Sequence, residues 1–522
     1  MSWRTTRAAG HPAQQSRQVA VIDLGSNSWR LVVFSFSPGA WWKRTDELYE
    51  TVRIGAGLGA SGRLSDEAIE RGLETLGVFE RFCRANQLAP SDVHVVATSA
   101  IRDAVNGEQF LAEARRQTGL TIETLSAAEE ARFGYVAAIN STTLTDGVVL
   151  DIGGGSMQLT LVHDRRAGAS ASFPLGAVRM TEEFLPGSDP AKKKELERLR
   201  AHVRESLSSL EWLRSSGSRL VGIGGAVRNL ASAAQAHLGE PVDLGVQGFV
   251  IKPEVLLELV AELADMTSDE RGELPGIKPG RGDIILAAAV VIETVLELGK
   301  FDGIEATEAG LREGVFLART MLDGAEPLFE HVREAAVRNL AIQYESDMTH
   351  VEHVARLSLQ MFDSLVAGGL FEPAEGEREL LWAASMLHDV GMTISYDDHH
   401  KHSRYLIESA ELPGFDPRER ALIAQVSRYH RKGIPKLGVI EPLTRPGDEQ
   451  LLDRCSVILR LSEHLERGRD QSVSEARLRA NGHGVDLHLE ASGDLTLQRW
   501  SVERYGDGEA FERVFRRRLL IG

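Results

Sequence analysis

Cysteine is scarce in this sequence, which has only Cys83 and Cys455 among its 522 residues. Two distant cysteines with no CxxC pair exclude a disulfide framework and a cysteine-rich zinc site. The start of the chain is polar and lacks the apolar segment of a signal peptide, so we expect residues 1–17 to form a disordered tail. These absences predict a protein of the reducing cytoplasm.

Long hydrophobic runs are also missing. The longest apolar stretch, residues 284–298, is interrupted by Glu293 and is shorter than the ~20 apolar residues that cross a bilayer. We therefore expect a buried helix in this stretch and no contact of the protein with a membrane.

Positive charge is in deficit, because 59 lysines and arginines face 76 aspartates and glutamates, for a formal net charge of −17. Such a chain repels polyanions at long range, so we do not expect nucleic acid as a partner. An anionic substrate would need a local cationic lining or a bound metal ion.

What the sequence does contain is an alternation of strand and helix patterns that occurs twice. It predicts an α/β fold class, with two related domains over residues 18–140 and 141–325. From residue 326 the pattern becomes helical, which predicts an all-α domain over 326–477. A small α+β segment is expected over 478–522, with a hairpin in the alternating stretch 485–503.

The two predicted α/β domains begin with nearly the same turn. The stretch VAVIDLGSNS at 19–28 returns as VVLDIGGGS at 148–156, so an apolar strand twice ends in an aspartate and a turn of small residues. Glycines let backbone N–H groups approach an anion, and serine and asparagine add donors. An aspartate suits such a cradle only if a divalent cation lies between it and the phosphate.

We therefore predict that Asp23 and Asp151 hold Mg²⁺ and that the two turns bind phosphate through Gly25, Ser26, Asn27, Ser28, Gly153, Gly154, Gly155 and Ser156. A third glycine turn, at 221–231, follows a strand and opens a helix, which adds Gly224 and Gly225 as phosphate ligands. The alternative is that all three are ordinary turns, with aspartate as a turn former and glycine serving strand-to-helix packing.

Six motifs together resemble the Ppx/GppA family of exopolyphosphatases and guanosine pentaphosphate phosphohydrolases: DLGSNS, TSAIRDA, SAAEEAR, DIGGGS, GIGGAVRNLA and GLREGV. The resemblance covers about residues 18–320. It implies two tandem ribonuclease H-like domains of the actin-like ATPase superfamily. The remainder resembles the HD-type helical domain of longer family members, and the family favours a homodimer.

The catalytic base is expected in SAAEEAR. Ser126 and Glu129 have the spacing of a capping box, which leaves Glu130 about 100° further round the helix and free to face the cleft. The resemblance also places the family's catalytic glutamate at Glu130, and places Arg102 in the phosphate pocket. The alternatives are that both glutamates merely occupy the first helical turn and that Arg102 pairs with Asp103 or a nearby glutamate.

Gln158 departs from the family pattern, which has a glutamate two residues after the serine of the second turn. An amide carries no charge to attract Mg²⁺, so we expect Gln158→Glu to raise magnesium-dependent turnover.

Histidines mark the second half of the chain. His353, the pair His388–Asp389 and His430 follow the order of HD-type phosphohydrolases, and Glu463 stands where that family has an aspartate. The resemblance thus implies a second metal site, held by His353, His388, Asp389 and Glu463, for manganese, iron or zinc. The alternative is a relic whose histidines are hydrogen-bonded within the helical domain.

A basic strip in the same half, RYHRKGIPK at 428–436, predicts a polyphosphate channel with Arg428, Arg431 and Lys432, although most charge runs are simply solvated. KKK at 192–194 is a second such strip. The RGD at 281–283 receives no role.

The function implied by the resemblance is that of a magnesium-dependent exopolyphosphatase that releases orthophosphate from the chain end, with Glu130 as general base. Hydrolysis of guanosine pentaphosphate is the nearest alternative. A sensor without catalysis and an HD-type phosphohydrolase with a regulatory front half are alternatives of other kinds.

Overall fold

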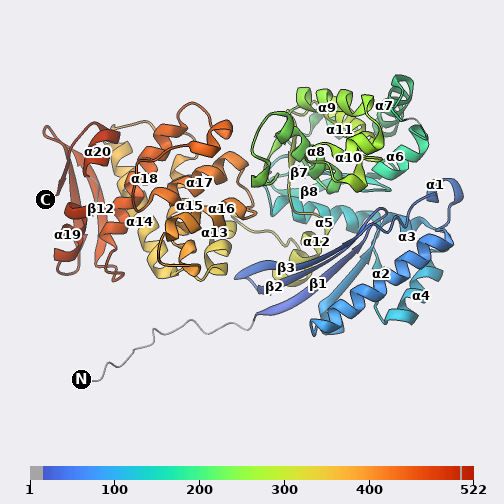
Figure 1. Ribbon diagram of the computed structural model, residues 1–522, viewed down its shortest axis with the longest axis horizontal. Helices are drawn as coiled ribbons and strands as arrows, with labels where there is room; N and C mark the ends of the chain where they lie inside the picture. Colours follow the sequence, from blue (N-terminus) through green and yellow to red (C-terminus); the bar gives the residue numbers. More distant parts are fainter. Residues whose placement is uncertain (1–15, 188, 506–507, 522) are drawn as a thin grey trace. The chain divides into compact units, whose positions relative to one another are not determined.

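The computed structural model describes residues 16–521 except 188, 506 and 507 (Figure 1). The chain folds as two compact units. Unit 1 extends to His237 and includes Gly248–Glu330, while unit 2 comprises Leu238–Gln247 and His331 onward. Residues 238–247 were expected in the second α/β domain, but Leu244 packs against the helical core of unit 2. Of the predicted tail, residues 1–15 lie outside the described residues, and Arg17 already begins a strand.

Unit 1 contains two sheets. The first has the strand order β3-β2-β1-β4-β5, with bounds β1 Arg17–Leu24, β2 Trp29–Ser37, β3 Trp41–Glu50, β4 Val93–Ala97 and β5 Ile122–Thr124. The second has the order β10-β11-β9-β6-β7-β8, with β6 Gly147–Ile152, β7 Met157–His163, β8 Arg166–Phe173, β9 Leu220–Ile223, β10 Val250–Ile251 and β11 Ile304–Ala306.

The two sheets repeat one plan. In each, an antiparallel hairpin (β1–β2 or β6–β7) is extended on the other side by a parallel strand, β4 or β9. Asp23 pairs with Arg30 across the first hairpin, and Asp151 pairs with Gln158 across the second. Asp23 and Asp151 are therefore equivalent positions of an internal repeat, and so are Arg30 and Gln158.

The helices of unit 1 are α1 Leu58–Ser61, α2 Asp66–Ala85, α3 Ser99–Asp103, α4 Gly107–Thr118, α5 Ala127–Ile139, α6 Ala177–Phe184, α7 Lys193–Leu207, α8 Gly225–His237, α9 Pro253–Asp265, α10 Ser268–Glu273, α11 Ile285–Gly299 and α12 Leu311–Phe316. The apolar stretch at 284–298 forms the buried helix α11, as predicted. Among the described helices, none has the length and apolar character needed to span a membrane.

Side chains of β1 alternate between two cores. Ala20, Ile22 and Leu24 pack with residues of α2 and α4. Val19 and Val21 belong to a different cluster, which also includes Val149 of β6 and side chains of α5 and α12. This second cluster joins the two sheets, because it takes one face from each of them.

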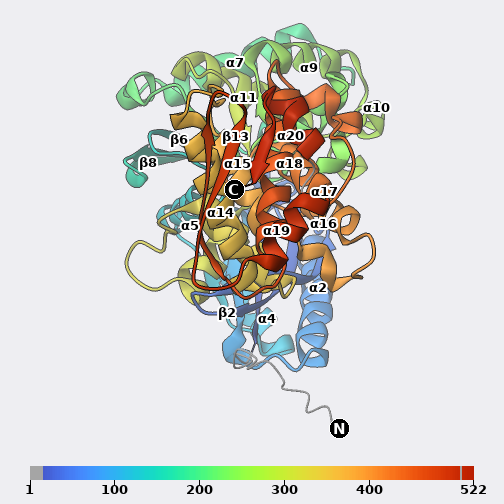
Figure 2. The same cartoon turned by 90° about the vertical axis from the view of Figure 1, so that its left-hand side faces the viewer.

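Unit 2 is built mainly of helices: α13 Val332–Gln343, α14 Met348–Ala367, α15 Glu377–Leu387, α16 His399–Ser409, α17 Pro417–Tyr429 and α18 Asp448–Leu465. A small sheet follows, of order β12-β13-β14, with β12 Val473–Ala480, β13 Val485–Ala491 and β14 Leu519–Ile521, and with helices α19 Thr496–Tyr505 and α20 Gly508–Phe515 (Figure 2).

The hairpin predicted within 485–503 is wrong in its second half. The partner of β13 is β12, which begins at Val473, before the boundary that we expected at 478. The stretch after β13 forms α19, because Asp494 Oδ1 accepts the N–H of Thr496 at 3.0 Å and starts a helical turn. The buried residues Gln498, Ser501 and Val502 then follow the helical period, not the alternation of a strand.

Candidate functional site

The two repeated aspartates open into one cavity. Val21 and Val149 lie in the core that joins the sheets, and side chains two residues further along a strand point to the same face. Asp23 and Asp151 therefore face the same side, and both line a cavity of about 120 Å³ within unit 1. The paired turns thus line one cavity.

The turns at 25–28 and 153–156 approach each other closely. A Cβ on Gly154 would lie 3.1 Å from Ser26 Cβ and 3.3 Å from the backbone nitrogen of Asn27, so a side chain there would require the facing turn to shift by a few tenths of an ångström. Ser26 Oγ also lies 3.1 Å from Ser99 Oγ at the start of α3. The predicted phosphate ligands that line the cavity are Gly25, Ser26, Asn27, Ser28, Gly153, Gly154, Ser156, Gly224 and Gly225.

Glu130 reaches the cavity from α5. The capping box is present, with Ser126 Oγ accepting the N–H of Glu129 at 3.2 Å and Glu129 Oε2 accepting the N–H of Ser126 at 2.8 Å. Glu129 is thereby held at the exposed helix end, while Glu130 is buried and lines the cavity. The different placement of the two adjacent glutamates follows the sequence prediction.

Arg102 does not line the cavity described here but lies behind Glu130. Its Nη1 donates to Glu130 Oε2 at 2.9 Å and to the carbonyl of Leu125, and its Nε donates to Asp103. Arg102 therefore orients the glutamate carboxylate. Gly155 faces a smaller adjoining hollow, where a Cβ would lie 2.7 Å from Ser99 Oγ.

Three carboxyl groups in one cavity disturb each other's ionisation. Burial, with Glu130 and Asp23 nearby, raises the pKa of Asp151 to about 7. Burial also raises the pKa of Glu130 against the opposing effect of Arg102, and it raises the pKa of Asp23 against Arg312 and Arg30. Asp23 Oδ1 is buried without a hydrogen-bond partner among the described residues. A divalent cation would offset both the charge repulsion and the unpaired oxygen.

Four arginines line the same cavity, and the sequence analysis assigned none of them a role: Arg30, Arg228, Arg281 and Arg312. Burial together with Arg312 and Arg228 lowers the pKa of Arg30 to about 10. Arg312 is buried, and its Nε lacks a hydrogen-bond partner among the described residues. Like charges gathered in a half-buried cavity form the cationic lining that an anionic substrate requires on a protein of net charge −17.

Signals for three of these arginines were present in the sequence. Arg228 and Arg312 lie within the motifs GIGGAVRNLA and GLREGV, and Arg281 belongs to the RGD that received no role. Arg30 was harder to find in the sequence, because it belongs to none of the six motifs and is placed opposite Asp23 only by the register of β1 and β2.

Gln158 lies on the same strand pair as Asp151 but does not line the cavity. Its Nε2 donates to Ser156 Oγ at 3.0 Å, and its buried Oε1 has no hydrogen-bond partner among the described residues. The side chain thus supports the serine of the second turn.

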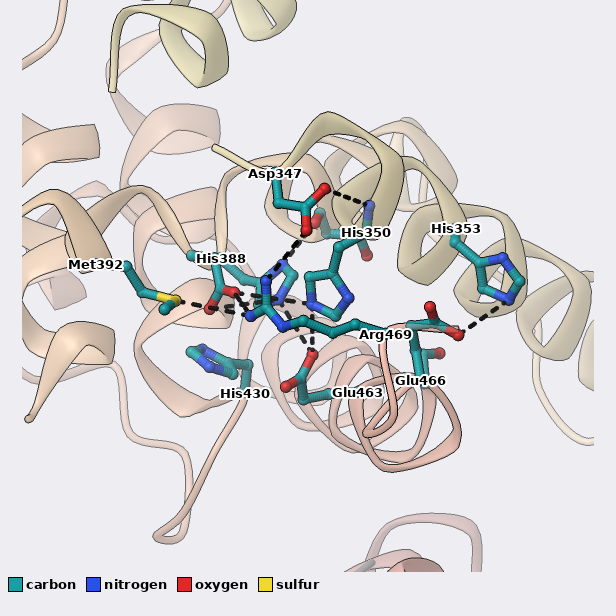
Figure 3. A network of polar contacts seen from close by, with 12 residues as sticks. Asp347, His350, His353, His388, Met392, His430, Glu463, Glu466 and Arg469 are labelled. Carbon is teal, nitrogen blue, oxygen red and sulfur yellow. Dashed lines mark hydrogen bonds and ion pairs between the residues drawn. The ribbon is translucent and has the colours of Figure 1, made fainter. Parts of the chain in front are cut away.

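A second cluster of ionisable groups lies in unit 2 (Figure 3). His350 of α14, the pair His388–Asp389 after α15, and Glu463 of α18 converge there, with His350 Nε2 and His388 Nε2 at 3.2 and 3.3 Å from Glu463 Oε2. Asp389 Oδ1 lies 3.3 Å from Nε2 of His399, the first residue of α16. Hydrogen bonds from His350 and His388 hold the pKa of Glu463 well below its usual range although burial alone would raise it.

The structure corrects one member of the ligand set expected in this cluster. His353 lies one helical turn beyond His350, with its Nε2 3.4 Å from Glu466 Oε2 and its Nδ1 3.1 Å from Arg356 Nη2. His350 takes the place assigned to His353, because only the earlier turn of α14 faces Asp389 and Glu463.

The basic strip at 428–436 is partly solvated. Lys432 is exposed, with its Nζ 3.6 Å from Asp398, and the Arg431 guanidinium lies over the Tyr396 ring. Arg428 is half-buried above the Tyr429 ring.

Comparison with known proteins bears on the cavity of unit 1. Residues 33–322 match the Ppx/GppA phosphatase family, and residues 332–502 match domain III of Ppx/GppA phosphatases. The chain belongs to the Ppx/GppA phosphatase family. It is therefore a hydrolase of phosphoanhydrides. The α/β fold class is confirmed, with two mixed sheets in unit 1 followed by a mainly helical region.

Individual Ppx/GppA relatives carry different names. A guanosine-5'-triphosphate,3'-diphosphate pyrophosphatase of Vibrio vulnificus is 28% identical over 482 residues, which cover 92% of this chain and 93% of that protein. A crystal structure of an exopolyphosphatase from Cytophaga hutchinsonii has a TM-score of 0.53 at 23% identity, over 57% of this chain and 96% of that one. An exopolyphosphatase-like protein has a TM-score of 0.52 at 27% identity, over 58% of this chain and 97% of that one.

Proposed function

We propose that this Ppx/GppA phosphatase is an exopolyphosphatase, which hydrolyses the terminal phosphoanhydride of inorganic polyphosphate and releases orthophosphate. The observation that carries the proposal is the convergence of four arginines and three carboxyl groups on one cavity. Such a cavity suits a substrate that is charged at every phosphate and is cut at its end by water.

The carboxyl groups fit a divalent cation. Asp23 and Asp151 would hold Mg²⁺, as the unpartnered Asp23 oxygen and the raised pKa of Asp151 support. When bound, Mg²⁺ supplies positive charge to the phosphate oxygens. The arginines bind the remaining phosphate charge, and the N–H groups of the two turns orient the end of the chain.

Glu130 is the base in this proposal. Its raised pKa keeps it ready to accept a proton, while Arg102 fixes the direction of its carboxylate. A buried carboxylate at the wall of the cavity can align a water molecule with the terminal phosphorus and take its proton.

Guanosine pentaphosphate is the second candidate substrate, favoured by the name of the Vibrio vulnificus relative, which spans nearly the whole chain. The lining of the cavity favours polyphosphate, because no aromatic side chain that could stack on a guanine is found among its described residues.

The test is a direct competition. Phosphate release is measured at matched Mg²⁺ with long-chain polyphosphate, tripolyphosphate and guanosine pentaphosphate as substrates. We expect the highest kcat/KM with polyphosphate. A higher kcat/KM with guanosine pentaphosphate would overturn the assignment of substrate while leaving the hydrolase chemistry intact.

A further inference from the structure

A row of three side chains leads from the cavity of unit 1 to the edge strand of the first sheet. Asp23 pairs with Arg30 across β1 and β2, and Arg30 pairs with Tyr49 across β2 and β3. Residues directly opposite each other on antiparallel strands project from the same face, so Tyr49 lies on the face that carries Asp23. Two strand spacings, about 10 Å, separate the two residues. Asp23 and Arg30 line the cavity, and the row continues beyond it to Tyr49.

The equivalent row of the second sheet is uncharged beyond Asp151. Asp151 pairs with Gln158 across β6 and β7, and Gln158 pairs with Ser172 across β7 and β8. Gln158 Nε2 lies 3.4 Å from Ser172 Oγ, so this row ends in two neutral side chains. The internal repeat is therefore asymmetric, and an anionic substrate that extends out of the cavity is stabilised on the side of β3.

Cations surround Tyr49, whose side chain is accessible because the residue is 37% exposed. The Arg30 guanidinium lies 4.8 Å from the centre of the Tyr49 ring, and Lys278 Nζ lies 5.9 Å from it. The hydroxyl oxygen of Tyr49 accepts a hydrogen bond from Thr51 Oγ1 at 3.2 Å. The proton of the Tyr49 hydroxyl is therefore available to another acceptor.

The Tyr49 hydroxyl adjoins two residues that line the cavity. Burial would raise the pKa of Tyr49, but a hydrogen bond with Thr51, the charge of Arg281 and a hydrogen bond with Ser28 lower it. Ser28 and Arg281 both belong to the lining of the cavity. Tyr49 therefore stands at the rim of the cavity, next to its phosphate-binding groups.

The positive charges beside Tyr49 lack acidic partners. The side chains of Lys278 and Arg281 make no ion pair or hydrogen bond with any described residue. Asp283, the acidic residue nearest to them in the sequence, lies 3.0 Å from Arg53 Nη1. Burial and the charge of Arg30 lower the pKa of Lys278. Uncompensated positive charge next to a hydroxyl donor is suited to an anionic group.

We propose that Tyr49, Lys278 and Arg281 form an outer phosphate subsite, which binds a phosphate group of the substrate beyond those held in the cavity. Arg281 connects the two places, because it lines the cavity and also acts on Tyr49. The Tyr49 hydroxyl donates to a phosphate oxygen, and Lys278 supplies a charge on a flexible stem. The inference rests on the proposed function, and it adds the direction in which the substrate leaves the cavity, along β3.

The test is the dependence of KM on chain length in K278Q and Y49F. Initial rates of phosphate release are measured with tripolyphosphate and with polyphosphates of increasing length. We expect K278Q to raise KM for long chains by about 3- to 10-fold, with kcat unchanged, and K278R to keep the wild-type KM. Y49F should raise KM by a smaller factor. Because one subsite holds one phosphate, the effect should be absent with tripolyphosphate, appear at one chain length and stay constant in longer chains.

K43Q is the matched control. Lys43 is exposed on β3, six residues before Tyr49, and makes no ion pair with any described residue. K43Q should leave KM unchanged. In K278Q the slope of log KM against log salt concentration should fall by roughly 0.7–0.9, as expected for one lost phosphate contact. An unchanged KM in both K278Q and Y49F would overturn the proposal, and so would an equal rise in K43Q or an equal effect at every chain length.

Binding measurements separate the outer subsite from the proposed function. In a Glu130→Gln background, K278Q should raise the Kd for long polyphosphate by the same factor as KM, whether or not the chain is cut. If K278Q raised KM only for guanosine pentaphosphate, the subsite would hold its 3'-diphosphate, and the path for polyphosphate along β3 would be overturned. If the wild type hydrolysed neither substrate, the proposed function would fail, while the Kd values would still decide the outer subsite.

Discussion

At the scale of single residues, the adjacent Glu129 and Glu130 occupy different environments. One closes the exposed capping box of α5, and the other lines the cavity beside Arg102. Replacing Glu130 by glutamine keeps the shape and removes the base, so Glu130→Gln should lower kcat by about 10²- to 10⁴-fold. Glu129→Gln retains a capping side chain and should leave kcat unchanged.

Both variants are compared by phosphate release under saturating substrate, with circular dichroism as a check of the fold. If Glu130→Gln kept wild-type turnover, the assignment of the base would fail. If it bound polyphosphate and released none, a sensor function of the wild type would be excluded as well.

Asp151 predicts how activity depends on pH. Its pKa is raised to about 7, so its carboxylate is lost at a higher pH than that of an ordinary aspartate as the pH falls. Glu130, whose pKa is also raised, shifts in the same direction. We expect kcat/KM to fall as the pH drops from 8 to 6.

The concentration of Mg²⁺ provides the control for this profile. Protons and the cation compete for the same carboxylates, so more Mg²⁺ should move the acid limb to lower pH. An acid limb that does not respond to Mg²⁺ would show that another group is titrating.

Gln158 is a position where an added negative charge should strengthen the binding of Mg²⁺. A glutamate there would lie on the face of Asp151 and next to Ser156. An added negative charge near the cation contributes on the order of 1 kcal/mol, or about fivefold in affinity. We expect Gln158→Glu to lower the Mg²⁺ concentration for half-maximal rate; Gln158→Asn is the uncharged control, and a rate no higher than wild type would contradict the prediction.

At the scale of elements, the repeated hairpins explain what could be predicted. Near the end of β1 and of β6 an aspartate is followed by small residues, and this local signal predicted the turn. The spacing of Ser126 and Glu129 is a separate local signal, which predicted the capping box of α5. The arginine lining was missed because it is assembled from four separate segments, and only the tertiary fold brings them together. The wrong hairpin at 485–503 has the opposite cause, since a local alternation there was overridden by the Asp494 cap and by pairing of β13 with β12.

The start of α8 gives a test of that arginine lining. A Cβ on Gly225 would collide with the Arg281 guanidinium. Gly225→Ala should therefore displace Arg281 and raise KM for polyphosphate by about 10- to 100-fold, the worth of a charge-assisted hydrogen bond.

Gly77→Ala in α2 is the matched control, because nothing lies within 4 Å of the added methyl group. It should raise the free energy of unfolding by up to about 1 kcal/mol and leave KM unchanged. An unchanged KM in Gly225→Ala, measured by initial rates, would remove Arg281 from substrate binding.

At the scale of the whole molecule, the net charge of −17 makes the few basic surfaces informative. If the strip of Arg428, Arg431 and Lys432 guides a long chain, replacing all three by alanine should raise KM for long polyphosphate by roughly tenfold and leave tripolyphosphate unaffected. Replacing Lys192, Lys193 and Lys194 by alanine changes the net charge equally, and those side chains are exposed.

The two triple variants are compared over a series of chain lengths and salt concentrations. Equal effects would mean that only total charge matters. No effect of the first variant on any chain length would remove the channel.

The carboxyl groups around Asp151 link the rate of hydrolysis to both pH and the concentration of Mg²⁺. Near neutrality a share of the molecules carries a proton on Asp151, one of the two carboxylates that we propose to hold Mg²⁺. Binding of the cation would then release this proton, and dissociation of the cation would allow Asp151 to take up a proton again. If Mg²⁺ binds at Asp151 as proposed, mild acidification and a low Mg²⁺ concentration should slow hydrolysis in the same way.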